Sequence, residues 1–363
     1  MKRTLFGTLL GLLAFVLLGE LLCRALPVSS ATRADYHIDP RILTYAPNHR
    51  FSYATGWDLR NPQRLTTNNF GFVAERPFRP DPTAVALIGD SHVEAASLPA
   101  DARPAAQLER SLGGRRAVYA MGSGGTALLD YAERIRFAHE HFGIRDFVIL
   151  MERQDVRQSL CGSGNVHSQC LDAVTFAPRT DPVAAPSAIK KLLRESALAQ
   201  YLVSQLKLDP GRLLRQAFAR SAPTSGEPSS DAVPTPKAAE RPPGANRHST
   251  AAIDAVTDTF FERVRAHIAG RLVIVVDSNR PALQRHQKVA DPDRDRFIER
   301  ARAAGAIVVD TEPLFRDHFE RSTLSLDVGP YDGHMNTRGV GLIAAAAARV
   351  LGDLASAPPR LAP

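Results

Sequence analysis

The feature that most constrains the fold is a set of short, fully apolar segments, each of strand length. The first, at residues 84–88, reads Ala-Val-Ala-Leu-Ile and is followed by Gly89. Runs of this kind are typical of parallel strands that are buried on both faces of a sheet. Further strands of the same kind are predicted at 118–121, 147–151, 272–276 and 306–309.

Segments with helical spacing alternate with these strands. They lie at 105–112, 128–142, 251–269, 294–304 and 339–354. In the second of them, Leu129, Ala132, Ile135 and Ala138 fall on one helix face. The alternation predicts a parallel sheet with right-handed crossovers, so we expect an α/β fold. Because each half has too few strands for a sheet of its own, we expect one doubly wound, flavodoxin-like domain over 81–360.

Two segments depart from this alternation. Residues 28–80 are rich in Pro, Arg, Asn and aromatic residues without a long period, which predicts an irregular extension wrapped on the domain. An insertion at 157–250 includes a predicted helix at 197–219 and then a stretch dense in Pro, Ser, Ala and Gly. That stretch, 221–249, cannot bury enough apolar surface to offset its ordering entropy, so we expect it to be disordered.

The N-terminus carries Lys2 and Arg3 before an apolar stretch that continues to Leu26, interrupted near its end by Glu20. A spanning helix needs ~20 residues, and basic residues before it place the N-terminus in the cytoplasm. We therefore expect a signal anchor at 1–27 that holds a single-pass protein in the inner membrane, with the catalytic domain in the periplasm or outside the cell. A cleaved signal peptide is the alternative, and it also implies export.

Export bears on the cysteines and on the choice of partner. Cys161 and Cys170 lie close together in a polar segment, and an oxidising compartment favours a disulfide between them. No His or Cys cluster lies nearby, so we expect no metal. The net charge of +7, from 45 Lys and Arg against 38 Asp and Glu, is carried mostly by scattered arginines. We therefore do not expect nucleic acid as a partner.

A candidate nucleophile, Ser91, stands in the sequence Gly-Asp-Ser-His directly after the first predicted strand. In open α/β sheets, ligands bind beyond the carboxyl ends of the strands. Serine needs a base that is itself oriented by a third group. His334 precedes the last predicted helix, and Asp332 lies two residues before it. The pattern predicts acyl transfer with Ser91 as nucleophile, His334 as base and Asp332 as the group that orients the imidazole.

These motifs resemble the SGNH (GDSL-like) hydrolase superfamily over most of residues 64–354. Gly-Asp-Ser at 89–91 resembles its first block, and Gly122 resembles the oxyanion glycine of its second block. The segment from Asp332 to Asn336 is similar to the last block of membrane-linked members that act on cell-surface polysaccharides, as are residues 67–72 upstream. The resemblance implies an SGNH fold and an esterase or O-acyltransferase without a cofactor. Its substrate would be an acylated, mainly acetylated, glycan or a small ester.

The third block departs from the family pattern. Where the family has Gly-x-Asn-Asp, whose Asn donates to the oxyanion, this chain reads Glu-Arg-Gln-Asp at 152–155. Gln154 offers the same amide donor on a longer side chain, and Arg153 offers a charged one. We expect an oxyanion hole built from the backbone N–H groups of Ser91 and Gly122, with Gln154 as third donor. The remaining pocket candidates are Asp90, His92, Arg153 and Asn336.

The departure at Gln154 also supports a second interpretation. A chain that has lost the oxyanion Asn is compatible with a catalytically degenerate, SGNH-like protein that binds a glycan or assists assembly of the cell envelope. For Asp90 a structural role in the turn before Ser91 is favoured over a catalytic one. Hydrolysis and acyl transfer stay open as alternatives, because they differ in how well the pocket excludes water and holds the acceptor.

Overall fold

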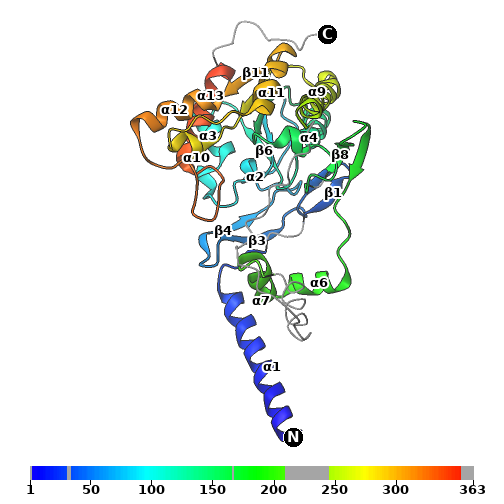
Figure 1. Cartoon of the computed structure of the whole chain (residues 1–363), viewed down its shortest axis with the longest axis vertical. Coiled ribbons are helices and arrows are strands. Elements are labelled where there is room, and N and C mark those ends of the chain that lie inside the picture. Colours follow the sequence, from blue (N-terminus) through cyan, green and yellow to red (C-terminus); the bar gives the residue numbers. More distant parts are fainter. Residues whose placement is uncertain (1, 31–33, 166, 209–244, 353–363) are drawn as a thin grey trace, which may run out of the picture.

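The computed structural model of the chain describes residues 2–30, 34–165, 167–208 and 245–352. A five-stranded parallel sheet forms its centre (Figure 1). The strands are β5 (Val85–Gly89), β6 (Val118–Gly122), β7 (Asp146–Met151), β10 (Leu272–Val276) and β11 (Ile307–Asp310). Their order is β11-β10-β7-β5-β6. In order along the chain this is 2-1-3-4-5, the flavodoxin-like order, so the α/β prediction is confirmed.

Helices cover both faces of the sheet (Figure 1). One face packs against α4 (Leu128–Phe142), α9 (Ala245–Val264) and α11 (Pro292–Ala303). The other packs against α3 (Pro104–Ser111), α12 (Thr311–Arg321) and α13 (Thr337–Gly352). Side chains alternate between the two cores along each strand, so Ile149 lies in the first and Leu150 in the second. Because each strand contributes side chains to both cores, its consecutive residues are nearly all apolar.

Several short helices were not expected from the sequence. They are α2 (Ser91–Glu94), α5 (Asp155–Gln158), α10 (Arg280–Gln284), and two 3₁₀ turns at Ala100–Ala102 and Arg265–His267. The longer α12 was also missed, although it begins where β11 ends. Asp310 caps it by accepting a hydrogen bond from the backbone N–H of Glu312 at 2.9 Å. Phe315 and Phe319, four residues apart, then face the core.

The segment 28–80 contains two antiparallel hairpins, which corrects the expectation of an irregular extension. The first pairs β1 (Asp35–Asp39) with β2 (Ile42–Thr44), and the second pairs β3 (Arg50–Thr55) with β4 (Arg60–Thr66). Strand β4 has a single apolar residue besides its proline, Leu65, so periodicity could not identify it. Leu65 is buried against a small apolar cluster of its own.

The insertion forms a third hairpin and a group of short helices. These are β8 (His167–Leu171), β9 (Pro178–Asp181), α6 (Ala188–Glu195), α7 (Ala197–Gln200) and a π-helical turn at Tyr201–Gln205. The helix predicted at 197–219 is thus broken at 201, and its part from 209 lies outside the described residues. The same holds for the disorder predicted at 221–249, except that 245–249 begin α9.

The disulfide and the apolar N-terminal helix that the sequence predicts are both present in the structure. Cys161 and Cys170 form a disulfide with their Cα atoms 5.2 Å apart, so the predicted bond is confirmed. Helix α1 (Lys2–Ala25) is the one helix among the described residues that is long and apolar enough to cross a membrane. It projects away from the α/β body and leaves its apolar side chains exposed (Figure 1).

Candidate active site

Ser91 lies beyond the carboxyl end of β5, as the first residue of α2. Its Oγ is 2.7 Å from Nε2 of His334, across 243 residues of sequence. Asp90 caps α2, because its Oδ1 accepts a hydrogen bond from the backbone N–H of His92 at 2.8 Å. The strand order reverses between β5 and its neighbours β6 and β7, the position where open α/β sheets bind ligands.

Asp332 contacts the other ring nitrogen of His334. Its Oδ1 lies 2.5 Å from Nδ1 and also accepts from the backbone N–H of His334 at 2.9 Å. Its Oδ2 accepts a hydrogen bond from Ser97 Oγ. Burial favours the neutral acid, but the hydrogen bonds from His334 and Ser97 outweigh burial and lower the pKa of Asp332 to about 2. The group beside the imidazole is therefore a carboxylate.

Two histidines share the site and differ in charge preference. Burial alone would lower the pKa of His334. The hydrogen bond to Asp332 and the negative charges of Asp332, Asp90 and Glu94 have a larger, opposite effect, so the pKa of His334 is raised overall. Burial, together with the charge of His334, lowers the pKa of His92 to about 3. The two rings lie with centroids 4.7 Å apart. His92 is thus held neutral beside a histidine that binds its proton more tightly than usual.

A buried arginine that sequence reasoning missed holds the loop that carries His334. Arg280 on α10 forms an ion pair with Asp277 and donates from Nε to Asp327 at 2.5 Å. Its Nη2 donates to the carbonyl oxygen of Gly333, also at 2.5 Å. No sequence motif identifies this arginine, because two of its partners, Asp327 and Gly333, lie 47 and 53 residues away in the sequence. Its role follows only from the contacts.

Asn336, a pocket candidate from the sequence, is instead a capping residue. Its Oδ1 accepts hydrogen bonds from the backbone N–H groups of Arg338 at 3.0 Å and Gly339 at 3.1 Å, at the start of α13. Its amide nitrogen donates to the carbonyl oxygens of Ser325 and Asp327. All of its side-chain atoms serve the loop and the helix, so it stabilises the position of His334 rather than lining a pocket.

A fully buried arginine lies beneath the nucleophile. Arg134 on α4 donates from Nη1 to the carbonyl oxygen of Gly89 at 2.5 Å and to that of Met121 at 3.3 Å. Its Nη2 donates to Thr126 Oγ1 at 2.9 Å. The guanidinium therefore binds together the carboxyl ends of β5 and β6. Both loops that flank Ser91 begin at these strand ends.

A buried carboxyl group lies between Ser91 and the loop after β6. Glu94 on α2 accepts hydrogen bonds from Tyr45 Oη at 3.0 Å and from the backbone N–H of Gly124 at 3.2 Å. Burial raises the pKa of Glu94. Sequence reasoning did not select this residue, since a glutamate in a short helix is usually solvated. In the fold it links α2 to the glycine loop.

The two glycines of that loop have different surroundings. A Cβ on Gly122 would lie 2.5 Å from the backbone nitrogen of Glu94, so this glycine is required for close packing of β6 against α2. A Cβ on Gly124 would lie 3.6 Å from the Cβ of Ser91. Gly124 is therefore the glycine that directly faces the nucleophile, whereas the motif comparison selects Gly122.

The third block is placed differently from the expectation. Arg153 forms an ion pair with Asp291 at 3.2 Å. Gln154 is exposed at the start of α5 and lies outside the set of residues that line the cavity beside His334. Its backbone N–H donates to Glu152, whose pKa is raised by burial to about 7. Glu152 is the residue of this segment whose carboxyl group is buried, while Gln154 immediately precedes α5.

A cavity of about 650 Å³ opens beside His334. It receives residues from β3, from the turn after α7 and from the loop that carries His334, and its lining includes His92 and Asp332. The lining residues are Ser29, Tyr53, Ala54, Thr55, Gly56, Trp57, His92, Ser204, Gln205, Leu206, Lys207, Tyr331, Asp332, Gly333 and His334. Among the residues that the structure describes, no group of His, Cys, Asp or Glu is arranged to hold a metal ion.

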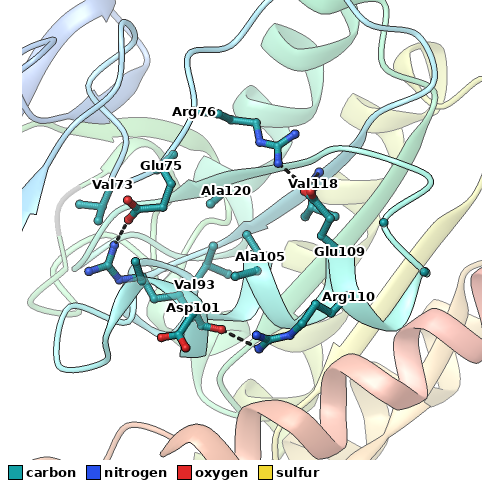
Figure 2. Close-up of a pocket in the computed structure, with 16 residues that line it drawn as sticks. Val73, Glu75, Arg76, Val93, Asp101, Ala105, Glu109, Arg110, Val118 and Ala120 are labelled. Atoms are coloured by element: carbon teal, nitrogen blue, oxygen red, sulfur yellow. Dashed lines mark hydrogen bonds and ion pairs between the residues drawn. The ribbon is translucent and has the colours of Figure 1, made fainter.

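Another cavity, of about 380 Å³, lies between α3 and the edge strand β6 (Figure 2). Four of its charged side chains form two ion pairs, and Arg110 donates to the backbone carbonyl of Asp101 at 2.6 Å. Glu75 pairs with Arg103 at 2.5 Å, and Glu109 pairs with Arg76 at 2.6 Å. His334 does not line it, whereas His334 does line the cavity described above. Ser91 lines neither cavity, but its Oγ is 2.7 Å from His334 Nε2. The cavity beside His334 is therefore the candidate substrate site.

Comparison with known proteins gives matches among solved structures only. No protein-family model and no curated protein matches the chain. A member of the lipolytic protein G-D-S-L family from Veillonella parvula is 11% identical, with 74% of this chain and 97% of that chain covered and a TM-score of 0.38. A carbohydrate acetylesterase from Sinorhizobium meliloti is 9% identical, with 75% and 99% covered and a TM-score of 0.35.

Proposed function

We propose that this chain is an exported, membrane-anchored serine esterase or O-acyltransferase of the SGNH type. The observation that carries the proposal is the hydrogen-bonded series from Ser91 Oγ through the imidazole of His334 to the carboxylate of Asp332. A serine needs such a base, and the base needs such an orienting group, to attack an ester at neutral pH.

The first half of the reaction transfers the acyl group to the enzyme. Ser91 Oγ bonds to the ester carbonyl carbon while His334 Nε2 accepts the hydroxyl proton. Asp332 stays ionised, stabilises the imidazolium and fixes the tautomer. The tetrahedral intermediate then breaks its bond to the leaving alcohol, which takes the proton from His334. The acyl group is left on Ser91.

In the second half an acceptor hydroxyl attacks this acyl group while His334 takes its proton. The second tetrahedral intermediate then breaks its bond to Ser91 Oγ, which takes the proton back from His334. Water as acceptor completes hydrolysis, and a sugar hydroxyl completes acyl transfer. During both halves the backbone N–H groups of Ser91 and Gly122 are the proposed donors to the oxyanion. The N–H groups of Ser123 and Gly124 instead donate to the carbonyl oxygen of Gly89 at 3.3 Å and to Glu94 at 3.2 Å, which supports a fixed loop next to Ser91.

A glycan ester fits the cavity. Tyr53, Trp57 and Tyr331 contribute aromatic rings to its lining, and such rings offer an apolar face together with a polar group. The similarity of the Asp332–Asn336 segment to members that act on cell-surface polysaccharides points to the same substrate class. The apolar helix α1 and the Cys161–Cys170 disulfide support an exported domain held at the inner membrane.

The test uses the full chain in detergent with p-nitrophenyl acetate and with an acetylated oligosaccharide. We expect release of p-nitrophenol and acetate, and a loss of about 10³-fold or more in Ser91→Ala. Ser163→Ala, which changes an exposed serine in another loop, is the matched control. A fluorophosphonate reagent should label Ser91 and leave Ser163 unlabelled.

Adding an unacetylated oligosaccharide to the same assay distinguishes the two reactions. A transferase would form the acetylated oligosaccharide faster than free acetate, and an esterase would not. Activity that is equal in Ser91→Ala and the unchanged chain would contradict the proposal. The glycan-binding interpretation of the fold would then replace it.

A further inference from the structure

Helix α6 carries an apolar face that nothing in the described part of the chain covers. Ile189 and Leu192 are 72% and 73% exposed, and Leu193 is 48% exposed. Their spacing of three and four residues places all three on one side of the helix. No residue of α6 is buried. A contiguous apolar stripe of this kind requires a partner that removes it from water.

The other side of α6 is basic. It carries Lys190, Lys191 and Arg194, with Glu195 as its single acidic residue. A helix with one apolar side and one basic side suits the plane of an anionic bilayer surface. There the apolar side chains enter the acyl boundary while the cations reach the headgroups. This charge pattern favours a lipid surface over a second protein as the partner.

Helix α6 is also held next to the helix proposed to span the membrane. It leads directly through Ser196 into α7, and Glu20 of α1 binds the start of α7. The Glu20 carboxylate accepts hydrogen bonds from Ser196 Oγ at 2.7 Å and from the backbone N–H groups of Ala197 at 3.1 Å and Leu198 at 3.0 Å. In Figure 1, α6 and α7 lie at the end of α1, with α6 running across its direction.

The same segment forms part of the rim of the active-site cavity. Tyr201 donates from Oη to the carbonyl oxygen of Trp57 at 2.9 Å, and Gln205 donates from Nε2 to that of Ala54 at 2.8 Å. Leu206 and Lys207, which follow, line the cavity together with Trp57 and His334. The end of α1, the helices α6 and α7, and the cavity rim are therefore one connected structure.

We propose that α6 lies in the headgroup region of an anionic bilayer and forms a second membrane contact beside α1. The two contacts hold the rim of the active-site cavity at the lipid surface, so Ser91 receives substrates presented at that surface. The proposal rests on the membrane anchor of the proposed function and is independent of catalysis. It makes the bilayer a partner of the folded domain as well as of α1.

The experiment uses the full chain in vesicles of phosphatidylcholine and phosphatidylglycerol whose acyl chains carry bromine, a quencher of tryptophan fluorescence. Trp57 is the only tryptophan of the chain, so Trp57→Phe gives a background without emission. Leu192→Trp then reports on the apolar side of α6, and Lys190→Trp reports on its basic side. Val174→Trp, in the β8–β9 turn, is a control at an exposed apolar position outside the region of α1 and α6.

We expect brominated lipid to quench Leu192→Trp strongly, Lys190→Trp less and Val174→Trp hardly at all. Quenching of Leu192→Trp should weaken when phosphatidylcholine replaces phosphatidylglycerol. Equal quenching at 192 and 174 would overturn the proposal, as would emission at 192 that is shifted to shorter wavelength without quenching, which indicates a protein partner. Quenching at 192 that does not depend on phosphatidylglycerol would overturn the anionic surface as the partner. Esterase activity of the unchanged chain in the same vesicles tests catalysis separately.

Discussion

Arg280 donates a hydrogen bond of 2.5 Å to the carbonyl oxygen of Gly333, the residue directly before His334. The same guanidinium binds Asp327 on the other side of the loop and the buried Asp277 at the end of β10. The position of the imidazole therefore depends on a cation that comes from a different part of the sheet. Arg280 is a positioning residue, because it reaches the site only through the loop.

Arg280→Lys should lower kcat by about 10- to 100-fold with little change in KM. Lysine keeps the charge beside Asp277 but lacks the planar group that reaches Gly333 and Asp327 together, and a misplacement of ~1 Å at a catalytic group can cost 10²-fold. Steady-state kinetics with p-nitrophenyl acetate measure the effect. Arg136→Lys, in an ion-pair cluster on α4, should leave both constants unchanged. Equal losses in kcat and stability for the two variants would refute a specific role for Arg280.

Activity should rise with pH through a midpoint above ~6.5, the ordinary value for histidine. His334 acts as a base only when it is neutral, and its pKa is raised, mainly by Asp332 against the effect of burial. In Asp332→Asn that interaction is lost, so the midpoint of kcat/KM against pH should fall and the rate should drop by about 10⁴-fold. Ser97→Ala removes only one hydrogen bond to Asp332 and should shift the midpoint less. An unshifted midpoint in Asp332→Asn would assign the titration to another group.

Glu152→Gln should stabilise the fold at alkaline pH. Burial raises the pKa of Glu152 from 4.5 to about 7, so the folded state holds its proton more tightly than the unfolded chain. The native carboxyl group therefore costs stability progressively as pH rises from about 4.5 to 7, and the full cost applies above that range. Glutamine cannot ionise, so thermal unfolding at pH 8 should show a gain of up to ~3 kcal/mol, absent at pH 4. A gain that is equal at both pH values would rule out ionisation as the cause.

Gln154→Ala should leave the rate of acyl transfer within about twofold, because the Gln154 side chain is exposed and its backbone N–H already donates to Glu152. The oxyanion hole would then be built from backbone donors alone. A loss of about 10²-fold, the usual effect of removing an oxyanion donor, would mean that the amide moves into the site when substrate binds. Rates from single-turnover kinetics separate this effect on chemistry from an effect on binding.

The sheet was predictable because its strands are buried on both faces. Residues 272–276 and 128–142 have the same bounds in the sequence prediction and in the structure, since an unbroken apolar run and a strict helical period leave few alternatives. The hairpin β3–β4 was not predictable. Its strands form a two-stranded sheet apart from the central one, and β4 is stabilised by one buried leucine and by backbone hydrogen bonds that any sequence can form.

The residues of the candidate site also divide into those that the sequence identified and those that it did not. Ser91, Asp332 and His334 stand at strand and helix boundaries within short local motifs, so their types and positions indicated a common site. Arg280 and Glu94 act through contacts between segments that are distant in sequence, and no local pattern marks such contacts. Gln154 was selected by its place in a motif, but the early start of α5 turns that segment away from the expected geometry.

If the chain is exported and anchored as proposed, the three hydrogen bonds that Glu20 accepts from the start of α7 bear on the fate of the N-terminal helix. A leader removed by proteolysis would take this carboxylate with it, and the amides of Ala197 and Leu198 would lose their acceptor. The bonds therefore favour retention of the helix in the mature protein. They also mean that α1 contributes a specific contact to the folded domain, so another apolar helix could not replace it without losing that contact. A chimera with a foreign transmembrane segment that lacks an acidic residue at this depth would stay in the membrane but lose the orientation of the enzyme toward it.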